Sequence, residues 1–172
     1  MVKILAVQLV VLAVFLSSQS GLAQEPDDFE LYDLTSRLVS TTRLRTAPDT
    51  KLLVVDFFSD SCKPCKKAIP EWKKLYEEYE KKGLRVLIVS IRQDDDVPTA
   101  RTKLKTFFGQ NPVPFPVVFD KYNMVAKQFG VVSKDGGSAS LPMVYLLDKA
   151  GKQLLKSEDV KKIAEKIDEK LN

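Results

Sequence analysis

The chain has 172 residues, and its 27 Lys and Arg against 23 Asp and Glu give a formal net charge of +4 at pH 7. Charges of both signs are spread along the sequence, so composition gives no reason to expect a nucleic-acid partner. Hydrophobic residues make up 44% of the chain, which predicts one domain with a substantial core. Histidine is absent and cysteine occurs twice, which argues against a structural zinc site with four Cys or His ligands.

Residues 1–23 carry the three parts of a secretory signal. Lys3 precedes the apolar run Ile4–Leu16, and Gly21-Leu22-Ala23 supplies a small-residue cleavage site. The run is shorter than the ~20 residues that span a bilayer, and no cysteine follows it that could carry a lipoprotein anchor. We therefore expect cleavage before Gln24, export to a periplasm or a similar compartment, and a mature form that does not span the membrane. An uncleaved N-terminal anchor is the alternative.

The mature chain begins with a segment whose pattern is weak. Leu31–Val39 has irregular apolar spacing and Thr41–Arg45 is polar, so neither is assigned to an element before a turn at residues 47–49. The next segment, Leu52–Phe58, is a nearly continuous apolar run, the pattern of a strand buried on both faces of a parallel sheet. Asp56 interrupts this run.

Cys62-Lys63-Pro64-Cys65 stands between that strand and a helical pattern with apolar residues at three- and four-residue spacing. At a helix N-terminus the first sulfur lies near unpaired backbone N–H groups, which favour its thiolate, while the second lies one turn inward. One sulfur can then attack and the other resolve. A structural disulfide is a weaker alternative, because so small a loop constrains the unfolded chain little. Three lysines lie near the cysteines: Lys63, Lys66 and Lys67. They fit a solvated helix start and stabilisation of a thiolate equally well.

The helix after the cysteines carries Pro70, which should kink it, and Gly83 can end it. Its apolar face holds Trp72, the only tryptophan, which we interpret as a core residue. Three consecutive aspartates, Asp94–Asp96, are interpreted as a helix cap rather than a metal site. The remaining pattern predicts, in chain order, a strand at Leu84–Ile91, a helix at Thr99–Phe108, a strand at Val117–Phe119, a helix at Met124–Phe129, strands at Met143–Leu147 and Lys152–Leu155, and a final helix capped by Ser157.

The segment Val55–Pro70 matches the thioredoxin active-site segment without a gap, including a proline five residues after the second cysteine. The chain therefore resembles the thioredoxin superfamily, and within it the exported TlpA/ResA-like thiol–disulfide oxidoreductases. The resemblance covers roughly Leu52 to the C-terminus and implies an α/β thioredoxin-like fold, so we expect residues 24–172 to form one thioredoxin-like domain. In it, helices flank a central mixed sheet, and a strand and a helix are inserted between Ile91 and Leu141. Leu141-Pro142 resembles the cis-proline loop that faces the cysteines and docks substrate.

The resemblance also implies roles for individual residues. Cys62 would be the nucleophile, Cys65 the resolving cysteine, and Asp56 a buried carboxylate that exchanges a proton with Cys65. A strand-end cap is the alternative reading of Asp56. Substrate would contact Ser61, Lys63, Pro64, Leu141 and Pro142. The chain departs from the family at Ser61 and Phe58, where tryptophan is usual, and at Met143, where a small polar residue is commoner.

These observations predict an exported thiol–disulfide oxidoreductase that reduces protein disulfides and acts as a monomer. The dithiol carries two electrons, so no organic cofactor and no metal are expected. The resemblance makes apocytochrome c a candidate substrate and a membrane thiol carrier the electron donor. A disulfide-forming oxidase and a non-catalytic binding module of the same fold remain alternatives, although a copper-delivery module would need a third residue between the cysteines and a histidine. A peroxiredoxin would need a Pro-X-X-X-Thr-X-X-Cys pattern, which the residues ahead of Cys62 lack.

Overall fold

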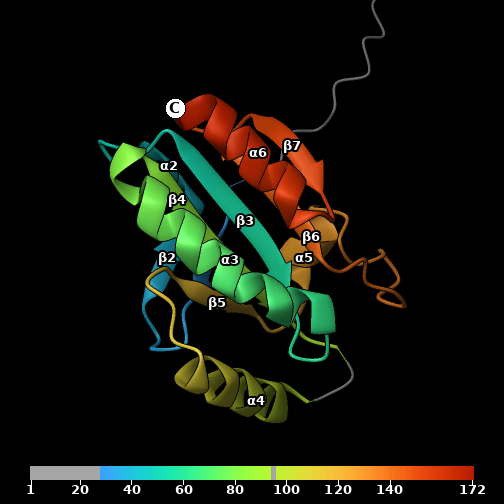
Figure 1. The fold of residues 1–172 in the computed structure, drawn as a ribbon. Helices are drawn as coiled ribbons and strands as arrows, with labels where there is room; N and C mark the ends of the chain where they lie inside the picture. The colour runs from blue at the N-terminus through green and yellow to red at the C-terminus, as the bar shows by residue number, and fades with distance from the viewer. Residues whose placement is uncertain (1–27, 94–95) are drawn as a thin grey trace, which may run out of the picture.

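The computed structural model describes residues 28–93 and 96–172, so the predicted signal peptide and two of the three consecutive aspartates lie outside the described residues. The centre of the fold is a five-stranded sheet in the order β5-β4-β3-β6-β7 (Figure 1). β3, β4 and β5 run parallel to one another. β6 runs antiparallel to β3, and β7 runs antiparallel to β6. The strands are β3 (Leu52–Phe58), β4 (Leu84–Ile91), β5 (Val117–Asp120), β6 (Met143–Asp148) and β7 (Gln153–Ser157).

Helices cover both faces of this sheet (Figure 1). One face packs against α3 (Lys63–Tyr79), α4 (Val97–Gln110) and α6 (Val160–Leu171). The other packs against α5 (Met124–Gln128) and the N-terminal segment. Because strand side chains alternate, even-numbered residues of β3 face α3 and odd-numbered residues face α5. All seven residues of β3 are buried, as the apolar run predicts.

The weakly patterned N-terminal segment forms a small hairpin and a short helix. β1 (Glu30–Tyr32) pairs with β2 (Leu38–Ser40), and α2 (Thr41–Thr46) follows directly. The hairpin lies beside β5 at the edge of the main sheet, where Asp33 bridges to Val118. This placement covers the free edge of β5.

Most predicted elements are confirmed, with shifted ends. α4 begins at Val97 rather than Thr99, because the Asp96 side chain accepts a hydrogen bond from Thr99 N at 2.9 Å and caps the helix. The prediction that Ser157 caps the final helix is wrong. β7 runs through Ser157, and the Asp159 side chain caps α6 by accepting from Lys161 N at 2.9 Å. The mixed sheet, and the insertion of α4, β5 and α5 between β4 and β6, agree with the fold expected from the sequence.

α3 ends at Tyr79 and is followed by a single 3₁₀ turn, η1 (Glu80–Lys82). Gly83 ends that turn with a φ of 108°, a left-handed conformation that favours glycine. A Cβ at this position would lie 2.6 Å from the carbonyl oxygen of Asp49, so a side chain cannot be accommodated. The helix therefore stops where the sequence predicts, and β4 starts at the next residue.

Candidate active site

The two cysteines lie at the start of α3 and differ in their exposure. Cys62 is the N-cap residue and is half-buried, and its Sγ accepts a hydrogen bond from Cys65 N at 3.2 Å. Cys65 is fully buried, one turn inside the helix. A disulfide joins the two sulfurs, and the two Cα atoms are 5.3 Å apart. Cys62 is therefore the more accessible of the two cysteines to a reactant from solvent.

Asp56 lies in the middle of β3, on the face that α3 covers, and is only 1% exposed. Its register partners on the neighbouring strands are apolar: Ile88 on β4 and Val144 on β6. Trp72 Nε1 donates a hydrogen bond to Asp56 Oδ2 at 2.8 Å. Burial raises the pKa of Asp56 to about 8, although the hydrogen bond from Trp72 acts in the opposite direction. A strand-end cap does not describe this residue, because it lies inside the strand.

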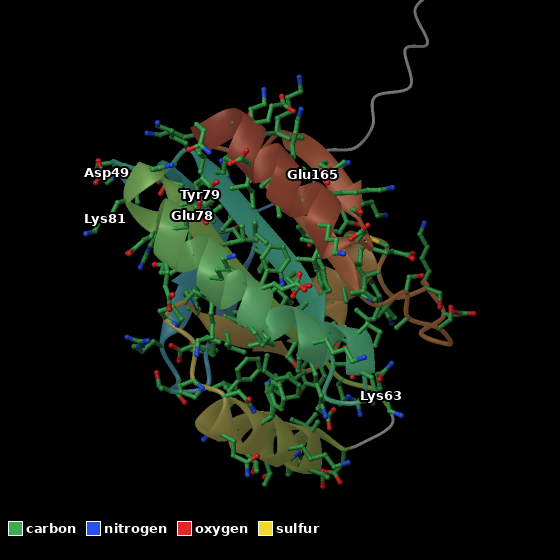
Figure 2. All side chains as sticks on the ribbon, in the orientation of Figure 1. Asp49, Lys63, Glu78, Tyr79, Lys81 and Glu165 are labelled. Atoms are coloured by element: carbon green, nitrogen blue, oxygen red, sulfur yellow. A yellow bond between two sulfur atoms is a disulfide. The ribbon has the colours of Figure 1, made fainter. Side chains whose placement is uncertain are left out.

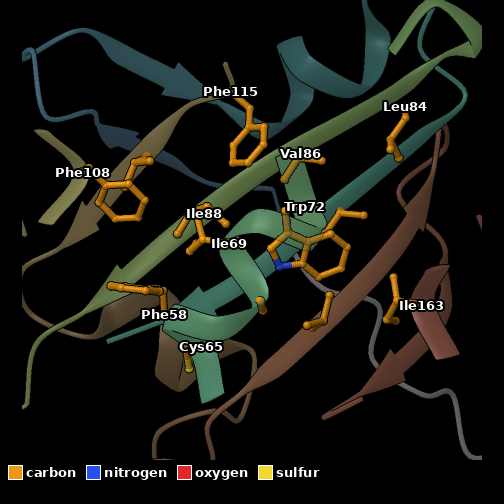
Figure 3. Close-up of a cluster of buried hydrophobic side chains, with 14 of the residues drawn as sticks. Phe58, Cys65, Ile69, Trp72, Leu84, Val86, Ile88, Phe108, Phe115 and Ile163 are labelled. Carbon is orange, nitrogen blue, oxygen red and sulfur yellow. The ribbon is translucent and has the colours of Figure 1, made fainter. Parts of the chain in front are cut away.

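Cys65 and Trp72 both point from α3 towards the sheet (Figure 3). They are seven residues apart, which is about two helical turns and places them on the same side of the helix. Cys65 Sγ is 4.0 Å from the carbonyl oxygen of Phe57, the residue next to Asp56. The buried sulfur, the carboxyl and the indole therefore share one side of the sheet, beneath one helix.

A hydrogen-bonded cluster supports the loop that precedes Cys62. The buried Ser59 hydroxyl donates to Gln93 Oε1 at 2.8 Å, and Ser61 Oγ bonds to the same oxygen. The two serine hydroxyls are also 2.9 Å apart. Gln93 follows β4 just as Ser59 follows β3, and the ends of parallel strands meet at one edge of a sheet. Ser61 was predicted as a substrate contact, but its bond to Gln93 was not predicted from the sequence.

The Leu141-Pro142 loop lies at the same end of the sheet. The peptide bond between these two residues is cis. Met143, the next residue, pairs with Phe57 near the end of β3, so the loop adjoins the segment that carries the cysteines. Leu141 is half-buried and packs against the same core cluster as Cys62. The structure thus places the predicted docking loop at the end of β3 that leads to the cysteines, while its contact with substrate stays a prediction.

Residues 23–152 of the sequence match the AhpC/TSA family, which has the thioredoxin fold. The chain belongs to the AhpC/TSA family. It is 28% identical over 152 residues to the thiol-disulfide oxidoreductase ResA of Bacillus thuringiensis subsp. konkukian, and the match covers 87% of this chain and 78% of ResA. It is 30% identical over 127 residues to the chloroplastic peroxiredoxin Q of Triticum aestivum, covering 73% of this chain and 54% of that protein.

The solved structures include the thioredoxin domain of a thiol-disulfide oxidoreductase from Bacteroides vulgatus. It is 20% identical to this chain, with a TM-score of 0.69 over 86% of this chain and 95% of that one. The fold, the ResA similarity and the Cys62–Cys65 pair together make this member of the family a thiol–disulfide oxidoreductase. Its redox centre is the cysteine pair.

The basic residues around the redox centre are on the surface. Lys63 and Pro64 are exposed at the start of α3, and Figure 2 shows Lys63 at that end of the helix. The Lys66 ammonium lies 5.3 Å from the centroid of the Phe107 ring on α4. Water and salt screen the charges of such exposed side chains, so their effect on a thiolate is weak.

Two further properties concern the described part of the chain alone. Within residues 28–93 and 96–172, no group of three or more Cys, Asp or Glu side chains is arranged to hold a metal ion. Over the same residues, no helix combines the length and the apolar character needed to cross a membrane.

Proposed function

We propose that this oxidoreductase is an exported reductase of protein disulfides, with Cys62 as its nucleophile. The difference in exposure between the two cysteines supports the assignment of Cys62 as the nucleophile. Cys62 is half-buried at a helix N-terminus, where a backbone N–H already points at its sulfur, whereas Cys65 is fully buried beneath it. Hydrogen bonds and helix dipoles of this kind favour a thiolate, the form that attacks a disulfide.

In the proposed reaction the Cys62 thiolate attacks one sulfur of the substrate disulfide, and the other substrate sulfur leaves as a thiolate. The resulting mixed disulfide joins Cys62 to the substrate. Cys65 then loses its proton and attacks the Cys62 sulfur, which releases the second substrate sulfur and forms the Cys62–Cys65 disulfide. The substrate gains two electrons and the enzyme loses two, so an external thiol donor must reduce the enzyme again.

Asp56 is proposed to accept the proton of Cys65. With a pKa of about 8 the carboxyl is partly ionised near neutral pH, so it can take up and return a proton within one cycle. Cys65 Sγ lies 4.0 Å from the carbonyl oxygen of Phe57, the residue next to Asp56, and both side chains lie on the side of the sheet that α3 covers. Protonated Asp56 would return its proton to Cys65 when the donor reduces the disulfide.

The surface around Cys62 is proposed to bind a polypeptide. Leu141 and Pro142 would lie along the substrate backbone, with the exposed Ser61, Lys63 and Pro64 at the rim. The family resemblance favours apocytochrome c as substrate and a membrane thiol carrier as donor. Cleavage of residues 1–23, export to the periplasm and a monomeric mature chain complete the proposal.

Reduction of insulin by the enzyme, with dithiothreitol as donor, tests this function. Wild type should accelerate insulin precipitation and Cys62→Ser should be inactive. In a separate incubation without dithiothreitol, the pre-reduced Cys65→Ser variant should accumulate a mixed disulfide with insulin, visible on a non-reducing gel. If Cys65→Ser stays free and Cys62→Ser forms the adduct, the assignment of the two sulfurs is wrong. Turnover of hydrogen peroxide at a rate that exceeds insulin reduction would instead favour a peroxidase.

A further inference from the structure

The Asp56 carboxyl receives a hydrogen bond from Trp72, a side chain that forms and breaks no bond in the proposed disulfide exchange. Trp72 Nε1 donates to Asp56 Oδ2 at 2.8 Å, and both side chains are essentially inaccessible to solvent. Among the side chains that the structure describes, Trp72 is the one that donates a hydrogen bond to the Asp56 carboxyl. An indole N–H is a donor and never an acceptor, so it stabilises the ionised carboxylate in preference to the neutral acid.

The elements packed around Asp56 present few titratable groups to it. β4 and β6 contribute Ile88 and Val144, and α6 contributes apolar side chains to the same cluster. On α3, Cys65 is the titratable group at the near end. Tyr79 lies at the far end, where its hydroxyl bonds to Asp168 (Figure 2). The charged side chains of α3 and α6 are exposed or half-buried at the surface. Trp72 is thus the polar contact that distinguishes this site from a purely apolar one.

We propose that Trp72 is the positioning residue of the proton acceptor: its indole N–H fixes the Asp56 carboxyl on the Cys65 side of the sheet and keeps it able to ionise. The inference rests on the proposed function, because it concerns the proton that Cys65 gives up. In that step the S–H bond of Cys65 breaks and its proton goes to Asp56. The Cys65 sulfur then bonds to the Cys62 sulfur, and the mixed disulfide between Cys62 and the substrate breaks, so that the substrate sulfur leaves as a thiolate. α3 thus carries both the resolving cysteine, Cys65, and, two turns later, Trp72, which positions the Asp56 carboxyl.

Trp72→Phe removes the donor and retains an aromatic ring in the core. The pH midpoint of the insulin-reduction rate should rise by about one to two units, because a hydrogen bond to a charged group is lost. In the Asp56→Asn background the same substitution should produce no shift. Tyr145→Phe is the matched control: it removes a buried aromatic hydrogen bond, to Phe129 O, on the opposite face of the sheet. It should leave the midpoint unchanged.

An unchanged midpoint in Trp72→Phe would overturn the inference, as would an equal shift in the Asp56→Asn background. A second measurement covers the case in which Trp72→Phe does not fold. Trp72 is the only tryptophan, so its emission reports on the group bonded to it. In the oxidised enzyme, where neither cysteine titrates, wild-type emission should change with a midpoint near pH 8 and Asp56→Asn emission should not. A flat wild-type titration would contradict the coupling.

The emission titration involves no turnover. If the enzyme failed to reduce insulin, the proposed function would be wrong, while the titration would still decide whether Trp72 senses the charge of Asp56.

Discussion

Replacing Asp56 with asparagine should make the protein more stable at neutral and alkaline pH. The carboxyl is buried among apolar side chains, and burial raises its pKa from 3.8 to about 8. The folded state therefore keeps a proton over a pH range in which the unfolded chain releases it. Stability from this group is complete below pH 4, falls as the pH rises towards 8, and is constant above that. Asparagine has almost the same shape and carries no charge at any pH.

The size of the effect follows from the pKa difference. Each unit of pKa difference corresponds to about 1.4 kcal/mol, so between pH 5 and pH 8 the wild type should lose about 3–4 kcal/mol through Asp56. Asp120 also has a pKa raised by burial, but it is present in both proteins and cancels in the comparison. The difference between variant and wild type thus isolates Asp56.

Urea denaturation of the oxidised proteins at pH 5, 6, 7 and 8 measures this difference. The variant should gain on the wild type steadily across the series, by about 3–4 kcal/mol in total. The disulfide is intact in both proteins, so its contribution cancels. Parallel stability curves for the two proteins would refute the argument that Asp56 is buried with a raised pKa.

The other predictions concern the reaction, the serine cluster and export. Asp56→Asn should slow disulfide exchange near neutral pH, and unchanged rates across the pH range would leave Asp56 with a structural role only. Gln93→Leu removes the acceptor shared by Ser59 and Ser61, so it should cost about 1 kcal/mol of stability and slow insulin reduction. The control is Gln110→Leu, at the exposed end of α4, and equal losses in the two variants would exclude a specific role for the cluster. Mass spectrometry of protein secreted to the periplasm should find Gln24 at the N-terminus, whereas a full-length membrane-bound product would disprove cleavage.

The sequence predicts the redox centre well because its signals are local. The cysteine spacing and the apolar run before it locate the N-terminus of a helix next to a buried strand, and both are confirmed. An aspartate inside an apolar run predicts a buried carboxyl for the same reason, and Asp56 is buried.

Other parts of the site depend on contacts between distant segments. Helical spacing places Trp72 in the core, as observed, but it does not reveal that the indole nitrogen meets Asp56. The bond between Ser61 and Gln93 joins residues 32 positions apart, at the ends of two strands whose pairing the sequence leaves unspecified. The N-terminal hairpin was not predicted because its apolar pattern is incomplete: Tyr32 and Leu38 are exposed. Ser157 is a good capping residue type, but the extension of β7 moved the cap to Asp159.

The direction of electron flow is the central claim, and opposing groups determine it. The helix N-terminus and the lysines stabilise the Cys62 thiolate and favour an oxidant, whereas an ionised Asp56 beneath the cysteines disfavours thiolate. The lysines are exposed and screened, so the buried carboxyl should dominate wherever it is ionised, near and above its pKa of about 8.

The midpoint potential of the Cys62–Cys65 pair, measured by equilibration against glutathione buffers, tests this claim most directly. It should lie nearer the roughly −270 mV of thioredoxin than the roughly −120 mV of DsbA. A potential above about −160 mV would contradict the account, because the enzyme would then form disulfides rather than reduce them.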